Sequence, residues 1–399
     1  MTTTVTSDTR RLLAAPTDDL GEHWRRHGEL PWSHTRELIP MLADAGLTGR
    51  GGAGFPTWRK LAAVAASGQS RAPVVVGNGA ESEPASAKDA ELLIRVPHLV
   101  LDGLQLAADA VGAERGYLYA ADRALSAVAA AVRARAGTDH IPITVVRAPD
   151  AFVAGQESAV VAAIEGRPAV PRDNLRRVSE SGVHGAPTLV QNVEMLAQIA
   201  LIARHGPDWF RGAGTAEQPG TFLVTLSGPV RAPGVTEVPY GITLGDLIGA
   251  FTEPVQALLV GGYHGAWLPA TASVRMTSAA LSEFGASPGA GVVIALPASS
   301  CPLAYTARVV DYLAAQGARQ CGPCLNGLPH LAHVLGRLAR GDREPRLVPD
   351  LTLLTALVTG RGACAHPDGT ARLVRSTLTM FAADVQAHLG GTCLARRAA

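Results

Sequence analysis

The chain has 399 residues, and its 35 Lys+Arg against 34 Asp+Glu give a formal net charge of +1. This balance excludes a general nucleic-acid binder, because neutralising phosphates requires an excess of basic residues. Hydrophobic residues make up 47% and charged residues 17% of the chain, which excludes global disorder, and the length favours two or three domains.

The hydropathy pattern contains no segment typical of export or membrane insertion. Acids and arginines interrupt every apolar stretch of the N-terminal region, which argues against a cleavable signal. No later stretch reaches the roughly 20 uninterrupted apolar residues of a membrane-spanning helix. The sequence therefore predicts a cytoplasmic protein without a transmembrane segment, which could dock peripherally on a membrane complex.

Strands and helices are expected to alternate through the first half of the chain, after a polar leader over residues 1–35. The expected elements are a helix over residues 37–45, a glycine loop at 49–54, a helix from residue 58, a strand at 72–76, a helix at 90–111, a strand at 117–119, a helix at 121–134 and a strand at 141–146. This alternation predicts an α/β domain with a mainly parallel sheet over residues 36–213.

The sequence pattern changes after residue 213. Residues 221–227 are typical of a strand, and prolines punctuate the short strands that follow, which predicts a small β-rich domain over residues 214–298. From residue 299 the pattern is helical, and an apolar stripe recurs with helical spacing at Val374, Leu378, Phe381, Val385 and Leu389. Several such helices predict a C-terminal helical bundle over residues 299–391, followed by a tail at 392–399.

The glycine loop carries Gly49, Gly51 and Gly54 with the GxGxxG spacing that lets phosphates approach a backbone. The preceding segment is helical in pattern, whereas this fingerprint normally follows a strand, so the glycines alone fit a tight turn equally well. Phe55 and Lys60 favour a ligand site, because an aromatic ring can stack on a flat ring and a lysine can pair with a phosphate. The loop therefore suggests a cradle for a flavin or a nucleotide.

A second unusual loop follows the strand expected at residues 72–76. Asn78, Glu81 and Glu83 lie there, at the edge where open α/β sheets bind ligands. Carboxylates at this edge could accept hydrogen bonds from ribose or ribityl hydroxyl groups. The loop is therefore a candidate binding site.

The same loop also has a purely structural interpretation. It would be a solvated acidic loop in which Lys88 and Asp89 pair at the start of the next helix. Only Lys60 and Lys88 are lysines among the 35 basic residues, and each lies beside one of the two unusual loops. Two further polar turns, at residues 155–158 and 187–192, are expected to begin helices.

The five cysteines are too few and too unevenly spaced for a disulfide framework. Cys321 and Cys324 form a CxxC pair, and together with Cys364 they suit iron–sulfur or zinc ligation. A thioredoxin-like dithiol is the alternative, although the preceding strand of such a unit is missing. Cys301 and Cys393 are interpreted as ordinary thiols.

These elements, in this order, resemble the flavoprotein subunit of NADH-quinone oxidoreductase. This subunit is called the F subunit in bacterial complex I and the 51-kDa subunit elsewhere. The resemblance extends to related subunits of NAD-linked hydrogenases and formate dehydrogenases. The resemblance covers residues 37–389. Its most specific parts are residues 49–57 with Lys60, residues 81–84 with Lys88 and Asp89, and residues 192–194. Residues 227–239 resemble that family's β-grasp, SLBB-type domain, which implies an FMN/NAD-binding domain, an SLBB-type domain and an iron–sulfur-binding bundle in succession.

The resemblance implies an NADH dehydrogenase-type enzyme that passes electrons from NAD(P)H through FMN to an iron–sulfur cluster. FMN would lie under the glycine loop with the nicotinamide above it, and no side chain would act as a catalytic acid or base. Phe55, Glu83 and Glu157 would position the nicotinamide for hydride transfer. The implied cofactor-binding residues are Gly49, Arg50, Gly51, Gly52, Gly54, Phe55, Lys60, Asn78, Glu81, Glu83, Gly155, Glu157 and Asn192.

The resemblance also implies a 4Fe–4S cluster. Its ligands would be Cys321, Cys324 and Cys364. The family uses four cysteines, and the position of the fourth is occupied by Ala318 here. A histidine or a partner would then supply the fourth ligand. Otherwise the cluster would be a 3Fe–4S form or absent. The candidate histidines are His330, His333 and His366. His366 is the favoured one, because it lies two residues from Cys364.

The family implies a thioredoxin-fold 2Fe–2S subunit or a ferredoxin as the electron acceptor, within a redox complex of further subunits. Several family positions near the nucleotide differ here, which leaves NADH, NADPH and reduced ferredoxin open as donors. They are Ala63, Ala80, Gln156, Asn174, Arg177 and Gln191. The alternative hypothesis is a non-catalytic relay or scaffold subunit that no longer turns over NADH, and a zinc-binding structural protein is the third.

Overall fold

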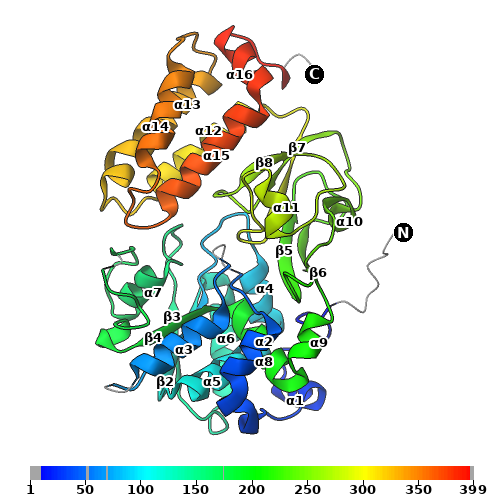
Figure 1. Cartoon of the computed structure of the whole chain (residues 1–399), viewed down its shortest axis with the longest axis vertical. Coiled ribbons are helices and arrows are strands. Elements are labelled where there is room, and N and C mark those ends of the chain that lie inside the picture. The colour runs from blue at the N-terminus through cyan, green and yellow to red at the C-terminus, as the bar shows by residue number, and fades with distance from the viewer. Residues whose placement is uncertain (1–9, 51–53, 69–70, 174, 396–399) are drawn as a thin grey trace. The chain divides into compact units, whose positions relative to one another are not determined.

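The computed structural model describes residues 10–50, 54–68, 71–173 and 175–395, and the chain divides into two compact units (Figure 1). The N-terminal unit comprises Met1–Val224 and Val235–Ile242, and the C-terminal unit comprises Thr225–Gly234 and Thr243–Ala399. Domain boundaries after residues 213 and 298 remain predictions.

The N-terminal unit contains a four-stranded sheet surrounded by helices. Its strands are β1 (Val74–Gly79), β2 (Arg115–Ala120), β3 (Ile143–Arg147) and β4 (Thr188–Asn192). Its α-helices are α1 (Leu20–His27), α2 (Leu38–Ala45), α3 (Thr57–Ser67), α4 (Lys88–Arg95), α5 (Pro97–Val111), α6 (Asp122–Ala134), α7 (Glu157–Ile164), α8 (Val193–His205) and α9 (Pro207–Arg211). Two short 3₁₀ segments are η2 (Trp32–Glu37) and η3 (Val183–Gly185).

The sheet is parallel, in the order β3-β2-β1-β4, which confirms the parallel sheet expected from the sequence. The expected polar turn over residues 187–192 is wrong in part, because Thr188–Asn192 form the mostly buried strand β4 before α8 begins at Val193. Successive valines of β1 alternate between its two faces, as strand geometry requires. Val75 packs into the core that α5 and α8 contribute to, whereas Val74 and Val76 pack with Val160 and Val161 of α7. Helices therefore cover both faces, as a parallel sheet needs.

The first strand extends to Gly79, whereas the sequence indicated an end at residue 76. Gly77 is the reason for the difference, because a glycine after a short apolar run is typical of the start of a loop. A Cβ atom at Gly77 would lie 2.6 Å from Leu118 Cδ1 and 3.0 Å from Leu196 Cδ1. This glycine therefore allows close packing inside the sheet.

Two long helices expected from apolar spacing are each broken. The helix over residues 90–111 is α4 and α5, separated at Val96, whose φ of −140° and ψ of 47° are not helical. Pro97 begins α5, where its missing N–H removes no helical hydrogen bond, and it disfavours a helical Val96. The C-terminal stripe is broken at Phe381, whose φ is −113°.

A second sheet has the strand order β6-β5-β9-β7-β8. Two short helices lie between its strands in sequence, and the longer helices follow its last strand. The strands are β5 (Thr221–Ser227), β6 (Gly234–Pro239), β7 (Val255–Val260), β8 (Ala266–Pro269) and β9 (Val292–Pro297). The helices are α10 (Leu244–Ile248), α11 (Ser278–Ser282), α12 (Pro302–Ala315), the π-helical turn η4 (Pro323–Gly327), α13 (Leu328–Ala339), α14 (Leu347–Val358), α15 (His366–Met380) and α16 (Ala382–Leu389). Helix α12 packs on α13 and α15, and α14 packs on α13 and α15 (Figure 1).

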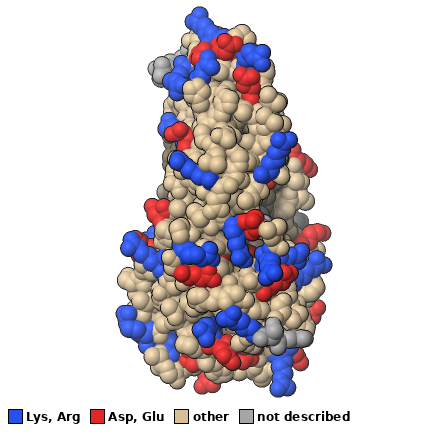
Figure 2. Space-filling model, turned by 90° about the vertical axis from the view of Figure 1, so that its left-hand side faces the viewer, with Lys and Arg blue, Asp and Glu red and all other residues tan. Residues whose placement is uncertain are grey.

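Charged side chains of both signs are interspersed over the face drawn in Figure 2. That distribution accords with the net charge of +1. Among the residues that the structure describes, no helix is both long enough and apolar enough to cross a bilayer.

Candidate functional site

The carboxyl ends of β1 and β4 form a topological switch point. From β1 the chain continues through β2 and β3 on one side, and β4 then returns to the other side. The register places Asn78 opposite Asn192 and Gly77 opposite Gln191. Open α/β sheets bind ligands at such a point, outside the carboxyl ends of the strands. The switch point is therefore the primary candidate site.

Five of the expected cofactor residues converge there from separate parts of the sequence. Asn78 Nδ2 donates to Gly155 O at 2.8 Å, and Asn192 Nδ2 donates to Asn78 O at 3.3 Å. Lys60 Nζ pairs with Glu157 and donates to Val190 O at 3.2 Å. The side chains of Lys60 and Glu157 are partly exposed, so this ion pair borders the surface.

Gln191 carries an unsatisfied donor next to this group. Its side chain is buried, with 3% of the residue exposed, and its Nε2 atom finds no hydrogen-bond partner among the described residues. A buried donor without a partner costs about 1–3 kcal/mol, which a polar ligand would offset. Together with Lys60 and Asn78, this donor fits the phosphate, ribityl and ring-edge acceptors of a flavin nucleotide. In the sequence, Gln191 differs from the family only by residue type, and only the tertiary structure shows that its amide donor lacks a partner.

The glycine loop leads from α2 into α3. Gly49 N donates to Phe55 O at 2.8 Å and Thr57 N donates to Leu47 O at 3.0 Å, which closes the loop at its base. Gly51 and Gly52 lie outside the described residues. Gly54 is exposed, and Phe55 is 46% exposed, so its ring offers a face for stacking.

The loops after β1 and β3 pack closely against each other. A Cβ atom at Gly155 would lie 2.8 Å from Ser82 Oγ, so a glycine permits this approach. Glu83, in the first of these loops, is 9% exposed, and its Oε1 accepts a hydrogen bond from Ala85 N at 3.3 Å. Glu157 follows Gln156, whose side-chain oxygen caps the start of α7.

Glu81 has a structural role in this arrangement. Its carboxylate accepts hydrogen bonds from Asp89 N at 2.9 Å and Ala90 N at 3.0 Å, and it pairs with Arg123. These bonds cap the amino end of α4, where a negative charge is favoured. Ser86 Oγ also donates to it at 2.8 Å, so the Glu81 side chain is already fully engaged within the protein.

The Arg50 side chain is buried against an aromatic ring. Its guanidinium carbon lies 4.4 Å from the centre of the Tyr240 ring, and Nη2 donates to Thr221 O at 3.3 Å. The residue is 4% exposed. Arg50 was expected to bind the cofactor because it lies in the glycine loop. Its side chain instead contacts Tyr240 and Thr221, which are distant in sequence.

Lys88 and Asp89 do pair at the start of α4, as the structural interpretation of the acidic loop expected. The pair is buried, however, rather than solvated. Lys88 Nζ lies 2.8 Å from Asp89 Oδ1 and 2.9 Å from Glu194 Oε2, and Asn192 Nδ2 donates to Asp89 Oδ2 at 2.7 Å. Burial alone lowers the pKa of Lys88, but Asp89 and Glu194 raise it above its ordinary value. This cluster fixes the position of Asn192 in the site.

The cysteines of the expected cluster form a second group, in which Cys321 and Cys324 lie between α12 and α13 and Cys364 lies just before α15. Burial raises the pKa of Cys321, but the N–H groups of Ala363 and Cys324 point at its sulfur and hold that pKa below its ordinary value. Burial and the neighbouring Cys321 raise the pKa of Cys324 to about 11. Burial likewise raises the pKa of Cys364. Thiolates that accept backbone N–H bonds are the donor set of iron–sulfur clusters.

His366, the favoured fourth ligand, has both ring nitrogens engaged with other groups. Its Nε2 donates to Leu313 O at 2.8 Å, and its Nδ1 lies 3.2 Å from His264 Nε2. Its backbone N–H, rather than its ring, reaches the sulfur of Cys364. His330 and His333 are exposed on α13.

Two family models match the chain in the regions of these two groups. The Nuo51 FMN-binding domain matches residues 42–201, which include the switch point. The NADH-ubiquinone oxidoreductase-F iron-sulfur binding region matches residues 304–388, which include the three cysteines.

Relatives match over most of the chain. The NADH-quinone oxidoreductase F subunit 2 of Rhizobium meliloti (strain 1021) is 31% identical over 375 residues, covering 88% of this chain and 89% of that protein. The corresponding F subunit of Mycobacterium bovis (strain ATCC BAA-935 / AF2122/97) is 30% identical over 386 residues, covering 90% and 86%.

A solved structure is similar as well. A chain of an NAD+-reducing [NiFe]-hydrogenase in the H2-reduced state has 28% identity and a TM-score of 0.83. The match covers 95% of this chain and 65% of that one. The chain therefore belongs to the family of the NADH-quinone oxidoreductase F subunit, and it is an FMN- and iron–sulfur-dependent oxidoreductase of the NADH dehydrogenase type.

Proposed function

We propose that the switch point binds FMN through Lys60, Asn78 and Asn192, with Gln191 as a further donor. The observation that carries this assignment is the convergence of these side chains at the carboxyl ends of β1 and β4. The Lys60 ammonium suits a phosphate or the electron-rich edge of a flavin. Gly49 and Gly54 would flank the cofactor from the glycine loop, and so would Gly51 and Gly52.

Phe55, Glu83 and Glu157 are proposed to face the nicotinamide nucleotide. The exposed Phe55 ring supplies a stacking surface, and the two carboxylates can accept hydrogen bonds from ribose hydroxyl groups. FMN held at the switch point would supply the hydride-accepting chemistry, and a cluster held by the cysteines would take its electrons one at a time. The chain's own contribution is to hold the two rings face to face, because orientation lowers the barrier without an acid or base.

Cys321, Cys324 and Cys364 are proposed to hold the cluster. Because the His366 ring is engaged with Leu313 and His264, the fourth ligand of a 4Fe–4S cluster would come from a group outside this set, and a 3Fe–4S cluster would need none. The helices around the cysteines would be the family's iron–sulfur-binding bundle, and the second sheet its SLBB-type β-grasp domain.

The electron acceptor is proposed to be a 2Fe–2S subunit or a ferredoxin, within a redox complex of further subunits. Relatives named as subunits of NADH-quinone oxidoreductase and of a hydrogenase support this proposal. A non-catalytic relay is less favoured, because the matching relatives are named as NADH-quinone oxidoreductase subunits and the FMN-binding family model covers the switch point.

An anaerobic titration of the purified chain with NADH would test this function. Flavin absorbance and the broad iron–sulfur absorbance should bleach together, because electrons would pass from the nucleotide to both groups. A flavin that dithionite reduces and NADH does not would instead favour the relay. Protein made with ample riboflavin and iron that contains neither group would contradict both.

Two variants on the same helix sharpen this test. Lys60→Met removes the cation at the switch point, and FMN affinity should fall roughly 10- to 100-fold, the cost of a charged hydrogen bond. Arg59→Met is the matched control, because the Arg59 side chain is exposed and lies over the Trp58 ring at 5.2 Å. Equal loss of FMN from both variants would argue against a specific role for Lys60.

A further inference from the structure

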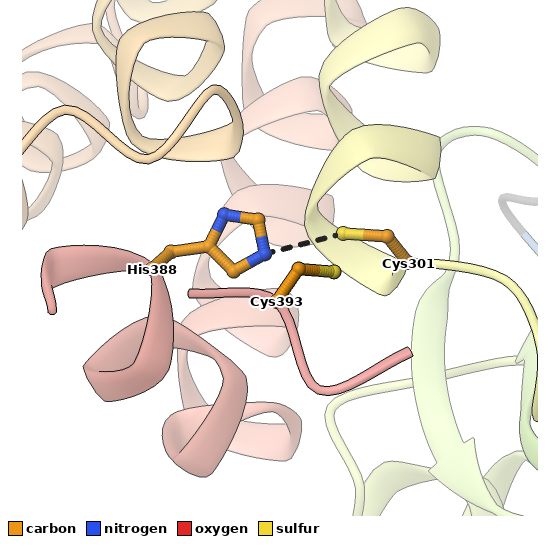
Figure 3. Close-up of side chains that lie close together, drawn as sticks. All are labelled: Cys301, His388 and Cys393. Atoms are coloured by element: carbon orange, nitrogen blue, oxygen red, sulfur yellow. Dashed lines mark hydrogen bonds between the residues drawn. The ribbon is translucent and has the colours of Figure 1, made fainter. Parts of the chain in front are cut away.

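Three metal-binding side chains meet at a place that the flavin and iron–sulfur sites do not use. Cys301, His388 and Cys393 each offer one ligand atom, and these atoms all lie within 4.8 Å of one another (Figure 3). Cys301 precedes α12, His388 lies in the last turn of α16, and Cys393 follows that helix. Sequence alone favours ordinary thiols, because Cys393 lies 92 positions after Cys301 and no local spacing joins the two.

The imidazole of His388 is oriented for coordination. Its Nδ1 lies 3.1 Å from Leu338 O, and a carbonyl only accepts, so Nδ1 carries the proton. The Nε2 lone pair then faces the sulfurs, 3.4 Å from Cys301 Sγ. A backbone carbonyl that fixes the tautomer of a ligating histidine in this way is a regular feature of metal sites. His388 is 3% exposed, which holds the ring in place.

The two sulfurs are placed by the ends of two helices. Cys301 is the N-cap of α12, and its Sγ accepts a hydrogen bond from Ala304 N at 3.4 Å. At α16 the chain reverses after His388, since Gly391 N donates to His388 O at 2.8 Å and Thr392 N to Ala387 O at 2.9 Å. This turn returns Cys393 to the imidazole.

The group of Cys301, His388 and Cys393 is separate from the cysteines expected to hold the iron–sulfur cluster. Cys324 lies just before Leu328, where α13 begins, whereas the carbonyl that orients His388 belongs to Leu338 near the end of that helix. Ten residues of α-helix span about 15 Å, so the two groups lie at opposite ends of α13. One cluster cannot use both sets of cysteines.

We propose that Cys301, His388 and Cys393 bind a zinc ion that fastens the segment after α16 to the start of α12. Two thiolates and one imidazole suit Zn²⁺, which is commonly tetrahedral with sulfur and nitrogen ligands, and water would complete the fourth position. On binding, the two thiol protons leave to solvent while two zinc–sulfur bonds and one zinc–nitrogen bond form. The two thiolate charges neutralise the ion in this half-buried place.

The test measures metals in the full chain purified under reducing conditions with its flavin and iron. About one zinc per chain is expected beside the iron, and zinc-edge X-ray absorption should show two sulfur ligands and one imidazole nitrogen. Cys301→Ser and Cys393→Ser should each lower zinc content roughly tenfold or more and leave iron content and visible absorbance unchanged. Cys321→Ser is the matched control, because it should lower iron and keep zinc.

His388→Gln provides a variant that keeps both thiols, in case a serine variant fails to fold. Cobalt added to the metal-depleted protein should give sulfur-to-cobalt charge-transfer bands that His388→Gln weakens and Cys321→Ser preserves. Three outcomes would overturn the proposal: no zinc bound even after one equivalent is added to the reduced protein, zinc lost only from Cys321→Ser, or a Cys301–Cys393 disulfide in the purified chain. Iron in place of zinc at this site would overturn the choice of metal.

Discussion

Lys88 Nζ lies 2.9 Å from Glu194 Oε2, although 106 residues separate the two in sequence. Both side chains are buried, and Glu194 Oε1 also accepts a hydrogen bond from Leu223 N at 3.0 Å. The pair joins the start of α4 to the start of α8, directly beside Asn192. Lys88 thus stabilises the residues next to Asn192 from within the core, whereas Lys60 lies at the partly exposed border of the site.

Replacing Lys88 by Met should destabilise the fold strongly. Asp89 and Glu194 would remain buried without their cation, which costs about 3–5 kcal/mol in comparable cases. Urea unfolding followed by circular dichroism measures this loss. Lys60→Met is the control, because its ion pair is partly exposed and worth about 0–1 kcal/mol. Similar unfolding midpoints for the two variants would contradict a difference in role between the lysines.

Asp102 is a second buried charge on which the fold depends. Its carboxylate lies 2.7 Å from His23 Nε2, 2.7 Å from Arg135 Nη1 and 2.6 Å from Arg204 Nη2. Asp102→Asn would leave the buried Arg204 guanidinium without a counter-charge and Arg135 with Asp139 as its remaining acidic partner, and a loss of about 3–5 kcal/mol is expected. Asp122→Asn breaks an exposed pair with Arg147 and should cost at most about 1 kcal/mol. Thermal unfolding of both variants compares them, and an Asp102→Asn melting temperature close to that of Asp122→Asn would refute this role.

His27 should make the fold less stable in mild acid. Burial and the nearby charge of His23 lower its pKa from 6.5 to about 4. Between these values the unfolded chain binds a proton that the folded chain does not, so stability falls as pH decreases from 6.5 to about 4. Urea midpoints across this range should fall less steeply in His27→Asn than in the unaltered chain. Parallel curves would show that the pKa of His27 is the same in the folded and the unfolded chain.

Alkylation of the metal-free protein should distinguish the cluster cysteines. Backbone N–H groups hold the pKa of Cys321 below its ordinary value, whereas the pKa of Cys324 is about 11. Because the thiolate is the reactive form, a brief iodoacetamide treatment at neutral pH should label Cys321 first. Peptide mass spectrometry measures the order, and earlier labelling of Cys324 would show that the N–H groups do not stabilise the Cys321 thiolate. Cluster-loaded protein should resist labelling at both positions.

Much of the fold and part of the site could be predicted from sequence patterns. Alternating strands and helices were sufficient to predict a parallel sheet, and the loop around Asn78 was placed at the carboxyl end of a strand. Local chemistry also singled out Lys60 and the Cys321–Cys324 pair. These features depend on spacing along the chain, which sets which residues share a face or a turn.

Only the tertiary structure determined which way several side chains point and what they contact. Glu81 caps α4 and Arg50 packs on Tyr240, although both lie in loops whose composition suggested ligand contacts. Cys301 and Cys393 meet at His388 because α12 and α16 pack together, which no local spacing encodes. Local sequence determined the elements and their loops, whereas contacts between distant segments decided which polar groups stay available for a ligand.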